Sequence, residues 1–121
     1  MYRPTQNYCQ ASLNTEEREA FRQAAKLQAQ EEFNDYLVDN GFGSKEHMKE
    51  WLRQCLDVAE LYEDAFDASE DALDLYKRAG DPYTDPEESF KLMVEAMAIE
   101  ERVRLYNEII AEKEALLASK N

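Results

Sequence analysis

The chain has 121 residues, of which 27 are Asp or Glu and 14 are Lys or Arg, so its formal net charge is -13. A chain of this length supports one hydrophobic core, and we expect a single domain over residues 1–121. Its 44% of hydrophobic residues argues against a disordered acidic tail. Only 3 Gly, 3 Pro and 1 His are present, which argues against β-turns, phosphate-binding loops and imidazole chemistry and favours an all-α fold.

The cysteine content and the N-terminus suggest where the protein acts. Two cysteines, Cys9 and Cys55, are too few for a disulfide-stapled secreted scaffold, and residues 1–4 contain no apolar signal core. No stretch approaches the roughly 18 apolar residues of a membrane span. We therefore expect a cytoplasmic protein that does not attach to membranes.

The first predicted element is a helix over residues 15–40, preceded by an N-terminal arm over residues 1–11 that shows no periodicity. Asn14 and Glu17 have capping-box spacing, and Gly41 or Gly43 is the expected stop.

The second predicted element is one long helix over residues 45–79, with Ser44 as its cap and Gly80 just past its end. Its large apolar residues are spaced by alternating steps of four and three, as in a coiled-coil seam. We expect this seam and the stripe beside it to form one wide buried face. The seam consists of Met48, Leu52, Cys55, Ala59, Tyr62, Phe66, Ser69, Leu73 and Tyr76. Beside it runs a stripe rich in small residues, comprising Trp51, Val58, Leu61, Ala65, Ala68, Ala72, Leu75 and Ala79.

The third predicted element is a helix over residues 86–118, with Asp85 as its cap and Pro86 in its first turn. Because the connection over residues 80–85 is short, the second and third helices should form an antiparallel hairpin. The expected architecture is thus an antiparallel bundle of three helices, with the first packed across the hairpin. Both a monomer and a homodimer that buries leftover apolar surface fit this pattern.

The negative charge is concentrated in one segment, because residues 54–90 contain 12 acidic and 2 basic residues. Eight carboxylates in this segment form what we call the acidic row, six of them spaced for one helix face and two beside it. The row consists of Asp57, Glu60, Asp64, Asp67, Asp71 and Asp74, with Glu63 and Glu70 alongside. We expect Asp81 and Tyr83, in the following loop, to extend this face as partner-binding residues.

The charge spacing of the acidic row is close to that of nucleic acid. The row would span about 26 Å and present one charge per roughly 3.6 Å, against about 3.4 Å for one strand of B-form DNA. Such a rod could occupy the basic channel of a nucleic-acid-binding protein. The alternative interpretation is an ordinary solvated helix face.

In size and charge the chain resembles a class of small, acidic, helical proteins that phages and mobile elements use to block defence nucleases. This resemblance implies a non-enzymatic inhibitor of a basic nucleic-acid-binding protein, such as a defence nuclease or an RNA-guided complex. The residues themselves provide no nucleophile with a base, no di-iron motif and no zinc-ligand spacing, so we expect neither catalysis nor a metal or other cofactor. The charge also argues against direct binding to nucleic acid.

A second functional hypothesis is a structural or adaptor bundle that works through homo-oligomeric or partner-helix interfaces. The two hypotheses differ in salt dependence. Binding steered by the acidic row should weaken steeply as salt rises, whereas an apolar interface should not.

Overall fold

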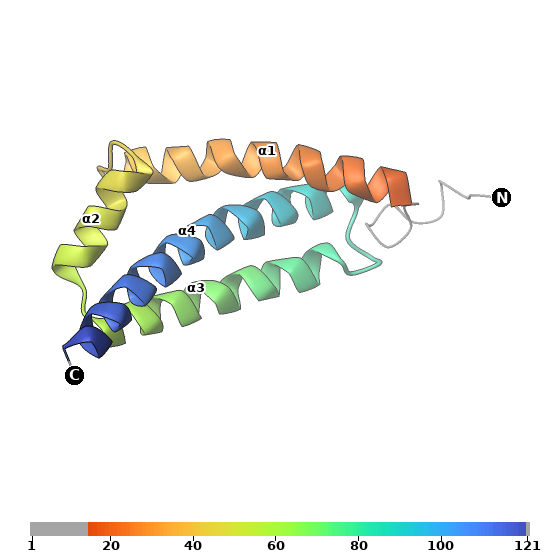
Figure 1. Ribbon diagram of the computed structural model, residues 1–121. Coiled ribbons are helices and arrows are strands. Elements are labelled where there is room, and N and C mark those ends of the chain that lie inside the picture. The colour runs from red at the N-terminus through yellow and green to blue at the C-terminus, as the bar shows by residue number, and fades with distance from the viewer. Residues whose placement is uncertain (1–14, 121) are drawn as a thin grey trace.

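The computed structural model describes residues 15–120, and this part of the chain is helical apart from its turns (Figure 1). Its four helices are α1 (Thr15–Asp39), α2 (Lys45–Cys55), α3 (Val58–Ala79) and α4 (Pro86–Ser119). The expected all-α class is confirmed, but the expected count of three helices is wrong. The predicted N-terminal arm lies outside the described residues.

The helix predicted over residues 45–79 is two helices, because the helical conformation is interrupted at Leu56 and Asp57. Leu56 has an extended backbone, and Asp57 is the N-cap of α3. The Asp57 carboxylate accepts a hydrogen bond from the Glu60 backbone N–H at 2.8 Å, and the Glu60 carboxylate accepts one from the Asp57 N–H at 3.1 Å. This capping box satisfies two backbone donors that a helix start otherwise leaves open. It favours the start of a new helix at this position.

The other helix limits follow the local sequence signals. The Ser44 hydroxyl accepts a hydrogen bond from the His47 N–H at 3.1 Å at the start of α2. The Asp85 carboxylate accepts hydrogen bonds from the N–H groups of Glu87 and Glu88 at the start of α4. Gly41 follows α1 with φ of 81°, a left-handed conformation that glycine adopts without steric cost. The limits predicted for α1 and α4 are therefore correct to within one residue.

Helix α4 is the element against which the other three pack (Figure 1). Helices α3 and α4 form the expected antiparallel hairpin. Helix α1 runs along the other side of α4 in the same direction as α4, and α2 crosses the end where α1 finishes and α3 begins. The outer surface of α3 therefore faces away from the rest of the bundle.

The buried face of α3 is the small-residue stripe alone. The expected wide buried face is therefore wrong for the seam residues of α3, although the seam residues Met48 and Leu52 of α2 are buried. The buried residues are Leu61, Ala65, Ala68, Ala72, Leu75 and Ala79. Alanine side chains let two helix backbones approach closely, and they bring α3 against Leu92 and Ala96 of α4. As a consequence, Tyr62, Phe66 and Leu73 lie on the outside of the bundle. Cys55 is also exposed, with a free thiol, although the sequence placed it in the core.

The turn between α3 and α4 is held by side chains that bind its free carbonyl groups. The buried Ser89 hydroxyl donates a hydrogen bond to the Ala79 carbonyl at 2.6 Å. The Thr84 hydroxyl donates one to the Arg78 carbonyl at 2.8 Å. Because the last carbonyls of a helix have no partner within the helix, these bonds stabilise the end of α3.

Helix α2 is held on α4 by apolar contacts and by ion pairs. Met48 and Leu52 are buried in the main core. Three basic side chains of α2 reach carboxylates of α4, in the pairs Lys45–Glu101 at 3.7 Å, Lys49–Glu108 at 2.9 Å and Arg53–Glu112 at 2.9 Å. The hydrogen bond from Arg53 holds the pKa of the Glu112 carboxyl below its usual range.

None of the helices in the described part of the chain is long and apolar enough to cross a membrane.

Candidate functional site

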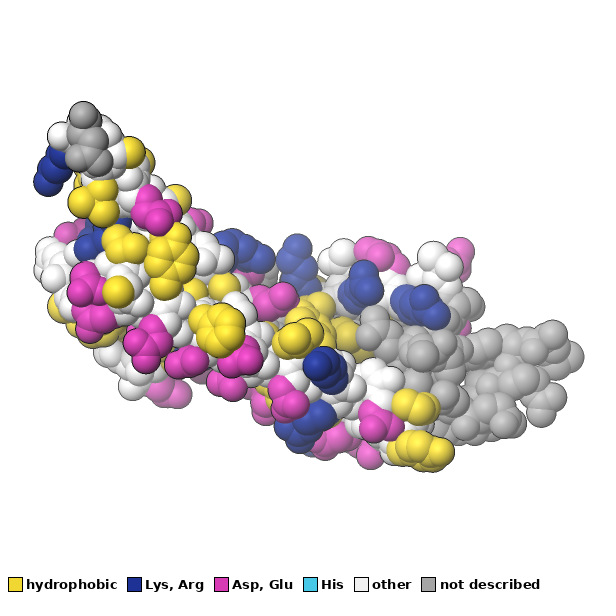
Figure 2. Space-filling model, turned by 90° about the horizontal axis from the view of Figure 1, so that it is seen from below, with side chains coloured by type: hydrophobic (Ala, Val, Ile, Leu, Met, Phe, Trp, Pro, Cys, Tyr) yellow, Lys and Arg dark blue, Asp and Glu magenta, His cyan; other side chains and the backbone are white. Residues whose placement is uncertain are grey.

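All eight members of the acidic row are exposed. Figure 2 shows the outer surface of the α3–α4 side, with acidic side chains gathered along it. Seven members belong to α3, and Asp57 caps its start. The helix therefore brings together the residues that the sequence assigned to one face.

Two members of the row have a structural function that the sequence analysis missed. Asp57 and Glu60 form the capping box at the start of α3. The Asp-x-x-Glu spacing is visible in the sequence, but the apolar residues around it keep a helical period and hide the break. These two carboxylates are thus engaged with backbone N–H groups of their own chain.

Most of the remaining row has no partner within residues 15–120. Asp74 lies 3.9 Å from the Arg78 guanidinium, and both side chains are largely exposed. The five members that make no ion pair or side-chain hydrogen bond within this range are Glu63, Asp64, Asp67, Glu70 and Asp71. On the opposite side of the bundle, the α4 carboxylates bind the basic residues of α2. The unpaired negative charge is therefore concentrated on α3.

A second row, which we call the apolar row, lies beside the acidic row on α3. It consists of Tyr62, Phe66 and Leu73, whose exposed fractions are 49%, 63% and 55%. The Tyr62 hydroxyl donates a hydrogen bond to the Glu114 carboxylate of α4 at 2.8 Å, so its ring is held in place across the hairpin. Figure 2 shows hydrophobic side chains interleaved with the acidic ones on this surface.

The apolar row adjoins a groove between α3 and α4 with a volume of about 440 Å³. From α3 it is lined by Ser69, Ala72, Leu73 and Tyr76, and from α4 by Glu100, Val103, Arg104 and Asn107. The Tyr76 hydroxyl donates a hydrogen bond to the Glu100 carboxylate. Burial, reinforced by this bond, raises the pKa of the Tyr76 hydroxyl above its usual range, so it stays a neutral donor. The groove thus has apolar side chains from both helices, together with polar and charged side chains of α4, among them Arg104, which is paired with Glu101.

Both residues of the predicted extension of the site into the loop are exposed. The Asp81 carboxylate accepts a hydrogen bond from the Tyr83 backbone N–H at 2.8 Å, which shapes the turn after α3. The Tyr83 side chain is 95% exposed. Asp81 therefore has a local structural function, and Tyr83 presents a free aromatic ring at the end of the hairpin.

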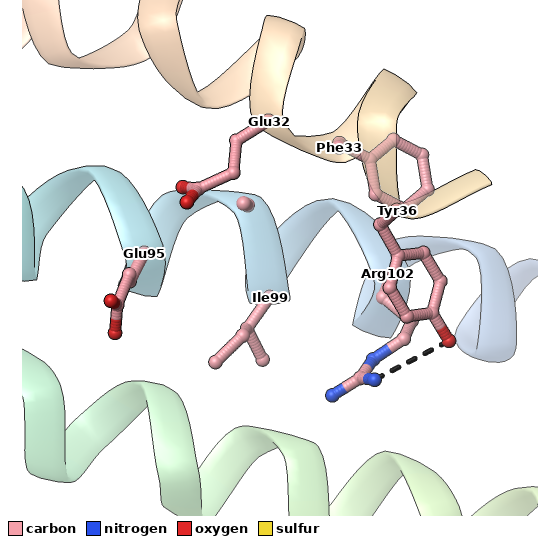
Figure 3. A pocket seen from close by; sticks show the side chains of 7 residues that line it. Glu32, Phe33, Tyr36, Glu95, Ile99 and Arg102 are labelled. Atoms are coloured by element: carbon pink, nitrogen blue, oxygen red, sulfur yellow. Dashed lines mark hydrogen bonds between the residues drawn. The ribbon is translucent and has the colours of Figure 1, made fainter. Parts of the chain in front are cut away.

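A separate cavity of about 250 Å³ lies between α1 and α4 (Figure 3). Phe33, Tyr36 and Ile99 give it apolar walls, and the Arg102 guanidinium lies 5.1 Å from the centre of the Tyr36 ring. The Arg102 Nη1 donates a long hydrogen bond of 3.4 Å to the Tyr36 hydroxyl, whereas its buried Nε has no hydrogen-bond partner within the described residues. Sequence analysis missed this cavity because its walls come from two distant helices.

The acidic end of this cavity is formed by Glu32 and Glu95 (Figure 3). Burial raises the pKa of the Glu32 carboxyl, and the negative charges of Glu95 and Asp35 raise it further. The described residues contain no cluster of His, Cys, Asp or Glu that could hold a metal ion.

No protein-family model, no curated protein and no solved structure matches this chain. Its function is therefore inferred from the geometry and chemistry of its surface.

Proposed function

We propose that the protein acts without catalysis, by binding a basic nucleic-acid-binding protein through the outer face of α3. The observation that supports this proposal is the run of five unpaired carboxylates in the acidic row. Like charges at these helical spacings disfavour the helix by about 0.2–0.5 kcal/mol per pair. A helix that needed only solubility could alternate Glu with Lys, as α2 does with Glu46, Lys49, Glu50 and Arg53.

The unpaired carboxylates favour long-range attraction of a positively charged surface. Exposed charges that are not already paired raise the rate of association with an oppositely charged partner, and the effect is screened by salt. The acidic row has nearly the charge spacing of one strand of B-form DNA, so a nucleic-acid-binding channel is the basic surface that we expect it to fit. Occupying that channel would prevent the partner from binding its nucleic acid, as expected of an anti-defence inhibitor.

The second hypothesis, a structural or adaptor bundle, is favoured by the exposed apolar row. Large apolar side chains gathered on one face commonly mark a protein interface. The two hypotheses place the interface on neighbouring rows of α3. Substitutions in one row at a time are therefore needed to distinguish them.

The test is capture of a partner from a lysate of the source cells by immobilised protein, followed by elution with duplex DNA. The variant Asp64→Lys, Asp67→Lys, Asp71→Lys should lose capture, because it reverses the centre of the acidic row. The matched control is Glu31→Lys, Asp35→Lys, Asp39→Lys, which changes the net charge equally on the exposed side of α1.

The expected result is a nucleic-acid-binding protein that the wild type and the α1 control capture, and that both DNA and raised salt release. Retained capture by the α3 variant would contradict the proposal, as would equal loss in both variants. Circular dichroism of all three proteins checks that the bundle stays folded.

A further inference from the structure

The apolar row on α3 has the spacing of a surface that receives another helix. Tyr62, Phe66, Ser69 and Leu73 follow one another at steps of four, three and four residues, and all four are exposed. These steps are those of a coiled-coil seam, whose residues face a partner helix. The row spans about 16 Å, or roughly three helical turns.

The shape of the surface beside the apolar row also suits a helix. The groove between α3 and α4 runs past Leu73 and is walled by Tyr76 and Val103. Apolar side chains of a docked helix could enter this groove while its backbone lies along α3. Amphipathic helices are recognised in this way, through a few apolar anchors at helical spacing.

The charges around the apolar row select the kind of helix that can dock. On the side of α3 away from the groove, Glu63 and Glu70 lie next to the apolar row, and the other carboxylates of the acidic row follow. A second copy of this chain docking through the same face would bring its own acidic row against this one, which is unfavourable. A helix with Lys or Arg beside its apolar stripe would be attracted to the Glu63 and Glu70 side, whereas Arg104, at the groove, is paired with Glu101.

We propose that the outer face of α3 binds an amphipathic helix that carries apolar anchors flanked by basic residues. This inference rests on the proposed function, because it uses the same acidic row, and it adds the kind of partner element recognised. The apolar row supplies contacts that hold the complex, and the acidic row supplies orientation and rate of association. Raised salt should therefore weaken binding, as the proposed function requires, but a helix with apolar anchors should lose less affinity than one that binds by charge alone.

The test uses two synthetic peptides of three heptads each. The first has Leu at the two seam positions of every heptad and Lys at the flanking positions, and the second has the same Lys residues with Ala in place of Leu. Affinity is measured by fluorescence anisotropy at low and high salt. We expect the Leu peptide to bind the wild type at least roughly tenfold more tightly, as burial of large apolar side chains predicts.

The α3 variant carries Phe66→Ser and Leu73→Ser together. The control variant carries Leu27→Ser. Leu27 is 66% exposed on α1, so its replacement also removes a surface apolar side chain. The α3 variant should lose roughly tenfold in affinity for the Leu peptide and keep its affinity for the Ala peptide. The Leu27 variant should bind both peptides as the wild type does.

Each other outcome overturns the inference in a recognisable way. Equal binding of the two peptides, or no effect of the α3 variant, would show that charge alone acts, and the proposed function would stand without the helix site. Binding of neither peptide would overturn the helix site alone, because the proposed function is tested separately by capture from the lysate. A wild-type dimer that the Leu peptide fails to dissociate would show that the occupant is a second copy of the chain.

Discussion

Glu32 shows how one carboxylate can work against folding while it lines a cavity. Its carboxyl lies between α1 and α4 near Glu95, with Asp35 one turn away on α1 (Figure 3). Because burial and both neighbouring charges raise its pKa, the folded state binds a proton at Glu32 more readily than the unfolded chain does. The ionised form therefore destabilises the fold at neutral pH.

We expect Glu32→Gln to raise the melting temperature at neutral pH, because it removes the ionised form that the folded state disfavours. The gain should shrink as pH falls through the raised pKa, since the wild-type carboxyl then becomes protonated and neutral as well. Thermal unfolding followed by circular dichroism at several pH values measures this difference. Glu31→Gln is the control, because Glu31 is an exposed neighbour that does not line the cavity, and an equal gain in both variants would contradict the assignment.

Arg102, at the other end of the same cavity, is a partly buried cation whose Nε the packing leaves unsatisfied. Its guanidinium gains from the face of the Tyr36 ring at 5.1 Å, but its Nε finds no acceptor within residues 15–120. A cation over an aromatic face contributes about 0.5–2 kcal/mol, which offsets part of the cost of burying it. The sequence offered no sign of this pairing, because Tyr36 and Arg102 are far apart along the chain.

At the scale of elements, the break between α2 and α3 is the main departure from the sequence prediction. Apolar residues continue at helical spacing through Leu56 and Asp57, so periodicity alone predicts one helix. The competing signal is the capping box of Asp57 and Glu60. Turning the chain there lets α2 lie across the end of the bundle and bury Met48 and Leu52. A straight helix would carry both side chains away from that core.

Asp57→Ala should lower the free energy of unfolding by about 1 kcal/mol, within a range of about 0.5–2 kcal/mol, because it removes an N-cap. Asp57→Asn should cost much less, because Asn is an equally good N-cap although it lacks the charge. Urea unfolding of both variants beside Asp67→Ala measures these changes. If Asp57→Ala were as stable as Asp67→Ala, the capping box would not matter for stability.

The variant Asp57→Asn also distinguishes the contribution of Asp57 to stability from its contribution to partner binding. A partner that recognises charge alone should bind Asp57→Asn more weakly than the wild type, although both proteins fold equally well. We expect a small loss of affinity for that variant compared with Asp64→Asn, because the Asp57 carboxylate is turned toward its own helix start.

The faces of α3 show why element identity is easier to predict than element orientation. The sequence contains two adjacent apolar stripes on this helix, and the one with larger side chains has the stronger coiled-coil spacing. The structure buries the other one, because Ala65, Ala68 and Ala72 allow a closer approach to α4 than Phe66 and Leu73 would. That choice depends on the surface α4 offers.

On the scale of the whole molecule, ion pairs and unpaired charge are segregated. The pairs Lys45–Glu101, Lys49–Glu108 and Arg53–Glu112 join α2 to α4 on one side. The five unpaired carboxylates of the acidic row and the apolar row share the other side, on α3 (Figure 2). The charged side chains between α2 and α4 thus bind one another, whereas those on the outer face of α3 remain available to a partner.

We expect the isolated protein to be monomeric at low ionic strength. An isologous dimer through the apolar row would place two acidic rows side by side with little salt to screen them. Sedimentation equilibrium measures the mass directly. A stable dimer at low salt that Phe66→Ser dissociates would contradict this expectation and would favour the adaptor hypothesis.

The sequence by itself determined the all-α class, the limits of α1 and α4, the hairpin and the concentration of acidic residues in one segment. These features depend on caps, helical periodicity, short connections and charge spacing, and each of these involves only residues that are close together in the sequence. Tertiary structure alone decided which apolar stripe of α3 is buried, that Cys55 is exposed, and that Glu32 and Arg102 line one cavity. Each of these depends on contacts between helices far apart in the chain, where shape and close approach outweigh local spacing.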